Sequence, residues 1–308
     1  MPATRAPAVF IVGPTASGKT AAAIALAGGL AGHPPAEAVN ADSRQVYRGM
    51  SIGTAKPTAA EQAGLRHHLV DITDPQDGFS LAAFLDAARE AIADVQGRGA
   101  LPIVVGGTGQ YVWGLAEGWQ VPRVPPDPVL RARLETEGPA ALHARLAQVD
   151  PEAAAAIGPR NTRRLVRALE VWEATGEPFS GQRQRAEPTF EPLLYGLRMP
   201  RETLYRRIDG RVDAMLAAGW PAEVRALLDA GCRPDHPAFS SAGYRDLAAY
   251  LLGQKSLDEA AHKAKVATHR LARSQDGWFR ADDPRISWCD GQQALVESAA
   301  KAVWARLT

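Results

Sequence analysis

The chain has 308 residues, of which 46% are hydrophobic and 22% are charged, the balance of a folded globular protein rather than a disordered one. At roughly 150 residues per domain, this length suggests about two domains. Lys and Arg number 35 and Asp and Glu 34, so any nucleic acid must be bound by local basic patches. Two cysteines exclude a disulfide framework, and no apolar run approaches the roughly 20 residues that span a bilayer. The N-terminus lacks the layout of a signal peptide, so we expect a cytoplasmic protein.

The first part of the chain predicts strands that alternate with helices. Short apolar or β-branched runs predict four strands, at residues 8–12, 38–42, 67–72 and 101–105. An Ala/Leu-rich segment at residues 20–31 predicts a helix that ends at its glycines, and apolar residues at helical spacing predict a helix over residues 80–95. This alternation favours a parallel sheet with helices on both faces, and such sheets bind ligands at the carboxyl ends of their strands.

The pattern changes near residue 118, where a proline-rich connection begins and strand signals stop. Two Asp-Pro pairs, at 127–128 and 150–151, have the cap-then-proline pattern of a helix start. Asn161 predicts the cap of a third helix. Residues 119–190 are therefore predicted to form a small helical insertion.

Strand patterns return after the insertion, at residues 192–199 and 286–289. Between them, helical spacing predicts a helix over residues 203–218, and Ser256 with Glu259 predicts the capping box of another. We divide the chain into a first core part at 1–118, the insertion at 119–190 and a second core part at 191–308.

Residues 13–20 read GPTASGKT and match the phosphate-binding P-loop pattern, between a predicted strand and a predicted helix. Glycines let the backbone curl around a phosphate, and the helix N-terminus adds partial positive charge. In this pattern Lys19 bridges phosphate oxygens and Thr20 places its hydroxyl on Mg²⁺. The predicted cradle for a diphosphate or triphosphate consists of Gly13, Pro14, Thr15, Ala16, Ser17, Gly18, Lys19 and Thr20. The core is accordingly expected to be an α/β fold like that of P-loop NTPases, with a parallel sheet.

A P-loop alone leaves the reaction open, because a small-molecule kinase, an NTPase and a transferase with a diphosphate leaving group all need one. Asp42, at the end of the second predicted strand, is a candidate general base, a Mg²⁺ ligand or a loop cap. Thr108, in a glycine turn after the fourth strand, either contacts a ligand or is an ordinary turn residue. Arg207 and Arg211 share one helix face, which solvent exposure alone would explain.

Several longer stretches carry a family resemblance. They are NADSRQVYRGMSIGTAKP at 40–57, GGTGQYVWGLAEG at 106–118, RRLVRALEVWEATGEP at 163–178, SSAGYRDL at 240–247 and RLARSQDGWFR at 270–280. Together with GPTASGKT, they resemble the tRNA dimethylallyltransferases of the bacterial type, in the same order along the chain. This family transfers a dimethylallyl group from its diphosphate to the exocyclic amine of the adenine just 3′ of the anticodon. The resemblance implies the same activity, with tRNA and dimethylallyl diphosphate as partners.

The resemblance also implies roles for single residues. Asp42 would accept the proton of the amine, Thr108 would contact the target nucleotide or the diphosphate, and Arg207 or Arg211 would contact the diphosphate. The positions implied for tRNA binding are Asp42, Ser43, Arg44, Gln45, Thr108, Arg131, Arg163, Arg164, Leu165, Val166, Arg167, Ser240, Ser241, Ala242, Gly243, Tyr244, Arg245, Arg273, Gln275, Trp278 and Arg280. The chain departs from the family pattern at Ser274 and at Asp276-Gly277, which weakens the expected RNA contact there.

Other functions compete with this one. An adenylate isopentenyltransferase prenylates a free nucleotide, which needs no arginine-bearing helical arm. A P-loop kinase needs ATP and a hydroxyl acceptor, and a pure RNA-binding module would leave the P-loop without a use. Because the sequence has no heptad seam, we expect a monomer.

Overall fold

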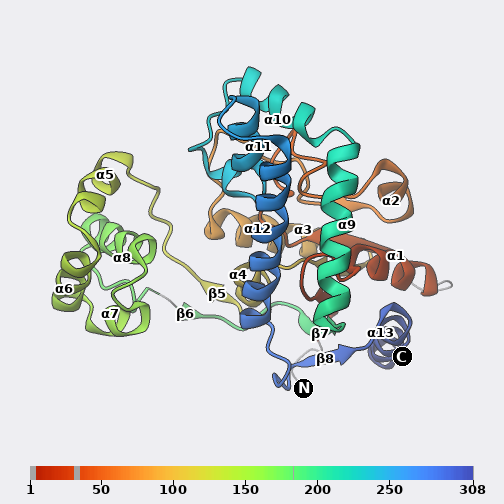
Figure 1. Cartoon of the computed structure of the whole chain (residues 1–308). Coiled ribbons are helices and arrows are strands. Elements are labelled where there is room, and N and C mark those ends of the chain that lie inside the picture. The colour runs from red at the N-terminus through yellow and green to blue at the C-terminus, as the bar shows by residue number, and fades with distance from the viewer. Residues whose placement is uncertain (1–4, 31–34, 183, 308) are drawn as a thin grey trace. The chain divides into compact units, whose positions relative to one another are not determined.

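The computed structural model describes residues 5–30, 35–182 and 184–307 (Figure 1). The chain forms two compact units. The core unit comprises Met1–Ala116 and Pro188–Thr308, and the insertion unit comprises Glu117–Glu187. Throughout the described ranges, every helix is too short or too polar to cross a bilayer.

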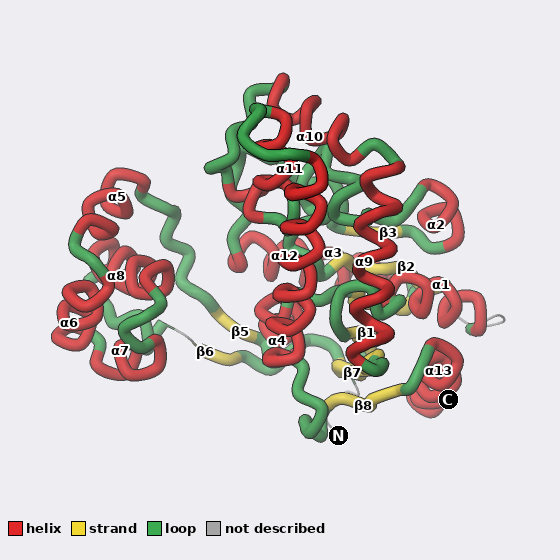
Figure 2. Tube along the Cα trace, in the orientation of Figure 1, coloured by secondary structure: helices red, strands yellow, loops and turns green. Residues whose placement is uncertain are grey.

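Strands and helices alternate through the first part of the core, and helices dominate the rest (Figure 2). The strands are β1 (Pro7–Val12), β2 (Ala36–Asn40), β3 (His67–His68), β4 (Leu101–Val105), β5 (Trp119–Gln120), β6 (Gln184–Arg185), β7 (Glu191–Leu197) and β8 (Ile286–Cys289). The helices of the first part are α1 (Lys19–Gly29), α2 (Ala59–Gly64), α3 (Leu81–Gly97) and α4 (Gly109–Ala116). Those of the insertion are α5 (Pro128–Thr136), α6 (Pro139–Val149), α7 (Pro151–Ile157) and α8 (Thr162–Thr175). The second core part has α9 (Arg201–Ala217), α10 (Trp220–Asp229), the 3₁₀ turn η1 (Pro237–Ser240), α11 (Tyr244–Leu251), α12 (Leu257–Trp278) and α13 (Gln292–Leu307).

Six strands of the core form one parallel sheet in the order β3-β2-β4-β1-β7-β8. The register pairs Val9 of β1 with Ile103 of β4 on one side and with Leu193 of β7 on the other. The central strand β1 is buried along its whole length. Strands buried on both faces are what a parallel sheet between two layers of helices requires. The expected α/β fold with a parallel sheet is therefore confirmed.

Helices α1 and α13 pack together over one face of this sheet. Ala22 and Leu26 of α1 and Leu295 of α13 lie in the same buried cluster as Val9 and Ile11 of β1. Because β1 alternates its side chains, Phe10 points to the opposite face, where its ring lies 5.9 Å from that of Phe190. The sheet therefore forms the middle layer. The ends of its strands are not covered by these layers and can bind ligands.

The insertion unit has its own small core. Leu134, Leu142, Leu146, Leu165 and Leu169, from α5, α6 and α8, are fully buried against one another. The predicted caps are confirmed: Asp127 accepts backbone N–H bonds at the start of α5, Asp150 at α7 and Asn161 at α8. The strands β5 and β6 pair antiparallel where the chain enters and leaves the unit.

Some element boundaries differ from those predicted. The second strand ends at Asn40 rather than at residue 42, because the Asn40 Oδ1 accepts the N–H of Asp42 and draws the chain into a turn. The third has two residues rather than six, because Leu69 and Asp71 have φ values of 61° and 57°, which are incompatible with a strand. The first helix ends at Gly29, one of the glycines at which its end is predicted.

No residue range was predicted for helices α2, α4, α6, α10, α11 and α13. Helix α2 begins at a capping box in which Thr58 accepts the N–H of Glu61 and the Glu61 carboxylate accepts the N–H of Thr58. The Thr-x-x-Glu spacing is its sequence signal. The last strand, residues 286–289, and the capping box of Ser256 and Glu259 are confirmed.

Candidate functional site

The carboxyl ends of three neighbouring strands bring the predicted site residues together. The cradle follows β1, Asp42 follows β2, and the glycine turn with Thr108 follows β4. These strands are adjacent in the order β2-β4-β1 and run parallel, so their following loops meet at one edge of the sheet. A parallel sheet of this kind binds its ligands at that edge.

The backbone of the cradle curls as a phosphate site requires. Gly13, Ala16 and Gly18 have φ values of 139°, 63° and 97°, so left-handed residues interrupt the loop and turn successive amides inward. A Cβ on Gly13 would lie 2.7 Å from the carbonyl oxygen of Leu197, so this position has room only for glycine. The hydroxyl of Ser17 is buried and has no hydrogen-bond partner among the described residues. A buried hydroxyl without a partner, next to backbone amides that point into the loop, is the arrangement expected of a phosphate-binding site.

The charge of Lys19 depends on its surroundings. Burial lowers the pKa of its ammonium to about 8, the nearby Asp42 carboxylate opposes this shift, and Arg211 adds to it. The ammonium donates a hydrogen bond to the Pro14 carbonyl at 2.8 Å. Although Arg211 as a whole residue is exposed, loss of water around its guanidinium lowers the pKa, and the Asp42 carboxylate opposes this shift. Lys19, Arg211 and Asp42 therefore form one electrostatic group.

Asp42 is held by its own loop. Its Oδ1 accepts the N–H of Arg44 at 2.8 Å, and its N–H donates to Asn40 at 3.2 Å. The Oδ2 atom accepts no hydrogen bond from the described part of the chain, so it remains available to a ligand. The carboxylate thus acts as a loop cap through one oxygen and presents the other.

Thr108 is linked directly to the residue after Asp42. Its Oγ1 accepts the N–H of Ser43 at 3.0 Å and donates to the Ser43 hydroxyl at 3.2 Å. The N–H of Thr108 donates to the carbonyl of Ala41 at 3.3 Å. The loop after β2 and the turn after β4 are therefore joined by side-chain and backbone bonds.

The residues fit a Mg²⁺ that binds together with a diphosphate. Magnesium takes oxygen ligands, commonly one or two from the protein with the remainder from phosphates and water. Thr20 lies in the first turn of α1, which carries no acidic side chain to compete for the amides. No group of three or more His, Cys, Asp or Glu within the described ranges is arranged to hold a metal by itself. The hydroxyl of Thr20 would be the protein ligand of such a phosphate-assisted site.

Residues 45–282 match the model of a family described as IPP transferase. The chain belongs to the IPP transferase family. The tRNA dimethylallyltransferase of Roseiflexus sp. (strain RS-1) is 53% identical over 278 residues, which cover 89% of this chain and 90% of that protein. That of Thermomicrobium roseum is 50% identical over 94% of this chain and 88% of that protein.

Solved structures of the IPP transferase family share the fold. The full-length tRNA isopentenylpyrophosphate transferase of Bacillus halodurans superposes with a TM-score of 0.71 at 39% identity, over 98% of this chain and 96% of that one. A eukaryotic dimethylallyltransferase solved in the act of modifying tRNA gives a TM-score of 0.81 at 26% identity, over 98% of this chain and 79% of that one. Family membership makes the present chain a prenyl-transferring enzyme.

In this IPP transferase, the predicted positions at the end of α12 have different environments. Gln275 is buried, and Trp278 packs on the turn after β4, where a Cβ on Gly109 would lie 2.1 Å from its Cγ. Arg273 donates to the hydroxyl of Tyr205 at 2.8 Å, and Arg280 pairs with Asp282. Of the departures from the family pattern, Asp276 pairs with Arg201 at 3.6 Å.

Residues 240–245, which were also predicted to bind tRNA, differ in their exposure to solvent. Ser240 and Arg245 are exposed, and Ala242 is half-buried. Ser241 and Gly243 are buried, as is Tyr244, whose hydroxyl donates to Glu223 at 2.7 Å. Burial raises the pKa of Tyr244 well above its usual value, so its hydroxyl stays protonated as a donor.

Sequence reasoning missed Glu223. Its carboxylate accepts the backbone N–H groups of Ser51, Ile52 and Gly53 at 2.7, 2.6 and 3.2 Å, as well as the Tyr244 hydroxyl. It therefore fixes the loop that begins at Asp42. No spacing in the sequence links a glutamate of α10 to a loop 170 residues earlier.

The predicted arginines of the insertion unit fall into two groups. Arg163 and Arg164 are exposed at the start of α8, and the structure gives their side chains no partner within the described ranges. Arg131 and Arg167 instead bind Glu170, whose side chain is 1% exposed. Arg131 donates to both carboxylate oxygens at 2.7 and 2.8 Å, and Arg167 donates to one at 2.6 Å. Leu165 and Val166, also predicted at the tRNA site, are buried in the core of the unit and do not reach its surface.

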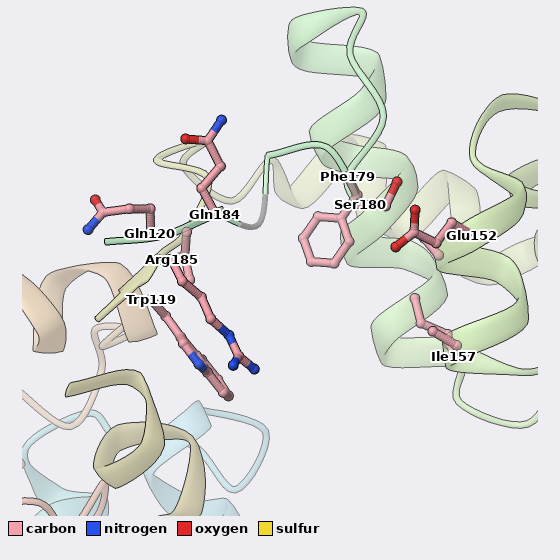
Figure 3. Close-up of a pocket in the computed structure, with 11 residues that line it drawn as sticks. Trp119, Gln120, Glu152, Ile157, Phe179, Ser180, Gln184 and Arg185 are labelled. Carbon is pink, nitrogen blue, oxygen red and sulfur yellow. The ribbon is translucent and has the colours of Figure 1, made fainter. Parts of the chain in front are cut away.

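The insertion unit also contains a pocket of about 210 Å³. In Figure 3, Trp119 and Arg185 extend from the β5–β6 ribbon, and Phe179 and Ile157 lie on the helical side. Ser180 is fixed beside it by bonds to Asp150. None of the residues predicted for tRNA or diphosphate lines this pocket.

Proposed function

We propose that this enzyme transfers a dimethylallyl group from dimethylallyl diphosphate to the exocyclic amine of the adenosine that follows the anticodon of a tRNA on its 3′ side. The observation that carries the proposal is the electrostatic group of Lys19, Arg211 and Asp42 at the edge of the sheet. In this group, two cations that would hold a leaving diphosphate interact with a carboxylate that would serve the attacking amine. The names of the relatives, one of them solved while acting on tRNA, support tRNA as the acceptor. The proposed location of the enzyme is the cytoplasm.

The chemistry follows from these charges. The C–O bond between the allyl group and the diphosphate breaks, and a bond from the adenine nitrogen to the allylic carbon forms. The amides of the cradle, Lys19 and Arg211 hold the negative charge of the diphosphate as it leaves. A Mg²⁺ at Thr20 would neutralise further charge on the diphosphate. The amine becomes acidic only as the new bond forms, and the free Oδ2 of Asp42 then accepts its proton.

The structure favours Arg211 over Arg207 as the diphosphate contact. Arg211 shares charge interactions with both Lys19 and Asp42, whereas the side chain of Arg207 lies 4.0 Å from the Met199 sulfur. Thr108 is held against Ser43 and so belongs to the acceptor side of the site. The exposed Arg163 and Arg164 would bind tRNA phosphates in the insertion unit, where they carry unpaired charge.

The test is a transfer assay with competing acceptors. The protein is incubated with Mg²⁺, labelled dimethylallyl diphosphate and either an unmodified anticodon stem-loop or AMP. We expect label on the stem-loop. Label on AMP alone would show an adenylate isopentenyltransferase, and transfer of the γ-phosphate of added ATP to a small molecule would show a kinase.

A variant of the same assay tests the base. Asp42→Asn should lower kcat by about 10²–10⁴-fold and leave stem-loop affinity nearly unchanged, because the amide cannot accept the proton but has the same shape. Asp77→Asn, at an exposed loop position, is the matched control. Undiminished turnover in Asp42→Asn would assign the proton to another group.

A further inference from the structure

Gln275 of α12 joins two loops of the site. Its side chain is buried, with 6% of the residue exposed. Its Oε1 accepts the N–H of Thr15 at 2.7 Å, and its Nε2 donates to the carbonyl of Gly107 at 3.0 Å. Thr15 belongs to the phosphate cradle after β1, and Gly107 to the turn after the adjacent strand β4. A single neutral amide therefore connects the donor side of the site to the acceptor side.

The glycine turn is shaped to receive this helix. A Cβ on Gly107 would lie 2.2 Å from the Gln275 Nε2, and one on Gly109 would lie 2.1 Å from the Cγ of Trp278. The indole N–H of Trp113 donates to the carbonyl of Trp278 at 2.9 Å. These contacts hold the last turn of α12 against the loop that carries the acceptor side.

We propose that Gln275 is a positioning residue for the transfer reaction, which holds the phosphate cradle and the Thr108 turn at a fixed separation. The proposal rests on the proposed function, because it assigns the two loops to donor and acceptor. The allylic carbon and the adenine nitrogen must approach to roughly 3–3.5 Å before reaction, and a misplacement of about 1 Å costs about 10²-fold in rate. Gln275 acts through Thr15 and Gly107 and does not touch the substrates.

The burial and bonds of Gln275 separate it from the RNA-facing residues of α12. Both of its polar side-chain atoms are bonded to main-chain groups of the core unit. The neighbouring Arg273 and Ser274 are exposed. Loss of the amide should therefore slow the chemical step without weakening RNA binding.

The first experiment compares Gln275→Met with Gln293→Met. Methionine keeps the length of the side chain and removes both bonds. Gln293 is exposed on α13, and among the described residues its side chain bonds only to Glu297 of its own helix. We expect the single-turnover rate of Gln275→Met, with both substrates saturating, to fall about 10–100-fold. The Kd for the stem-loop should stay within about 3-fold of wild type, and Gln293→Met should match wild type.

The second experiment uses pH to restore the bridge. In Gln275→Glu the ionised carboxylate still accepts from Thr15 but repels the Gly107 carbonyl, whereas the protonated carboxyl can also donate to Gly107. Burial raises a carboxyl pKa toward neutrality, so the ratio of the variant's rate to that of wild type should rise at least about 5-fold from pH 8 to pH 6. Taking the ratio at each pH removes the titration of Lys19 and of the diphosphate.

The outcomes are distinct. A stem-loop Kd weakened 10-fold or more with an unchanged single-turnover rate would make Gln275 an RNA contact and overturn the proposal. A pH-independent ratio in Gln275→Glu would also overturn it, by reducing the residue to a packing role. If the wild-type protein transfers no label to the stem-loop, the proposed function itself is wrong. The wild-type assay is therefore carried out before any variant is tested.

Discussion

At the scale of single residues, the protonation state of the charged groups in the site depends on how far each group is exposed to water. Lys19 is partly buried in the cradle, and the loss of water there outweighs the attraction of Asp42, so that its pKa is lowered to about 8. An ordinary lysine keeps its charge until about pH 10. The ammonium that should bind the diphosphate is therefore close to losing its proton under mildly alkaline conditions.

This shift predicts a pH limit for donor binding. Because the pKa is lowered to about 8, Lys19 is charged below that pH and becomes neutral as the pH rises through it. The kcat/KM for dimethylallyl diphosphate should then fall above pH 8, by up to about tenfold per unit. Lys19→Arg, which stays charged, should show a flat profile up to pH 9.5 at a lower absolute rate. A wild-type profile that stays level from pH 7 to 9.5 would contradict the assignment.

At the scale of single elements, α8 shows how one helix divides its arginines between packing and solvent. Glu170, on its buried side, accepts bonds from Arg131, from Arg167 and from the N–H of Asp127. Burial alone would raise the pKa of this carboxyl, but these bonds outweigh it and lower the pKa to about 2. Arg163 and Arg164, in the first turn of the same helix, are exposed to solvent.

This division predicts opposite effects for two arginine substitutions. Arg163→Ala should lower the slope of log Kd against log salt for the stem-loop by about 1, because one phosphate contact is lost. Its thermal midpoint should not change. Arg167→Ala should lower the thermal midpoint, because it leaves the buried Glu170 with one arginine fewer. An unaltered salt slope in Arg163→Ala would make that arginine part of an ordinary solvated surface.

Glu170 itself should stabilise the fold in a pH-dependent way. Its folded pKa of about 2 lies below the ordinary value of 4.5, so its contribution is present in full above about pH 4.5 and is lost as the pH falls through about 2. Glu170→Gln should cost about 3 kcal/mol in the free energy of unfolding at pH 7. The difference should shrink toward pH 2 in urea titrations. An equal difference at pH 7 and pH 2.5 would mean that packing, not charge, is lost.

At the scale of the whole molecule, the first and last segments of the insertion unit pair with each other in a short ribbon. The N–H of Ala186 donates to the carbonyl of Gly118 at 2.9 Å, and Trp119 pairs with Arg185. The chain therefore enters and leaves the insertion unit at adjacent positions. Every residue of the phosphate cradle, Asp42 and Thr108 belong to the core unit.

Removing the insertion should therefore separate the two substrates. Because residues 118 and 186 are already adjacent, a short glycine-rich turn can replace 119–185. We expect the core to bind dimethylallyl diphosphate within about 3-fold of wild type, and the stem-loop at least 10-fold more weakly. Equilibrium binding of both labelled ligands is the measurement. Wild-type stem-loop affinity in the shortened protein would remove the insertion from the RNA site.

The sequence by itself determined what depends on local geometry. The strand and the helix on either side of residues 13–18, the caps at Asp127, Asp150 and Asn161, and the last strand follow from short-range steric and hydrogen-bonding rules, and the structure confirms them. The same rules do not predict the order of the strands in the sheet. They also predicted too long a third strand, because nothing in the residue types of Leu69 and Asp71 indicates their positive φ values.

Only the tertiary structure decided which charged and polar groups remain free. Arg131 and Arg163 look alike in sequence, yet Glu170 binds only the first of them. Gln275 lies among exposed residues in sequence, yet it is buried and bonds two loops whose bonding residues, Thr15 and Gly107, lie 260 and 168 positions away from it along the chain. Such pairings depend on which strands become neighbours, since a buried polar group must find its partner wherever the fold places one.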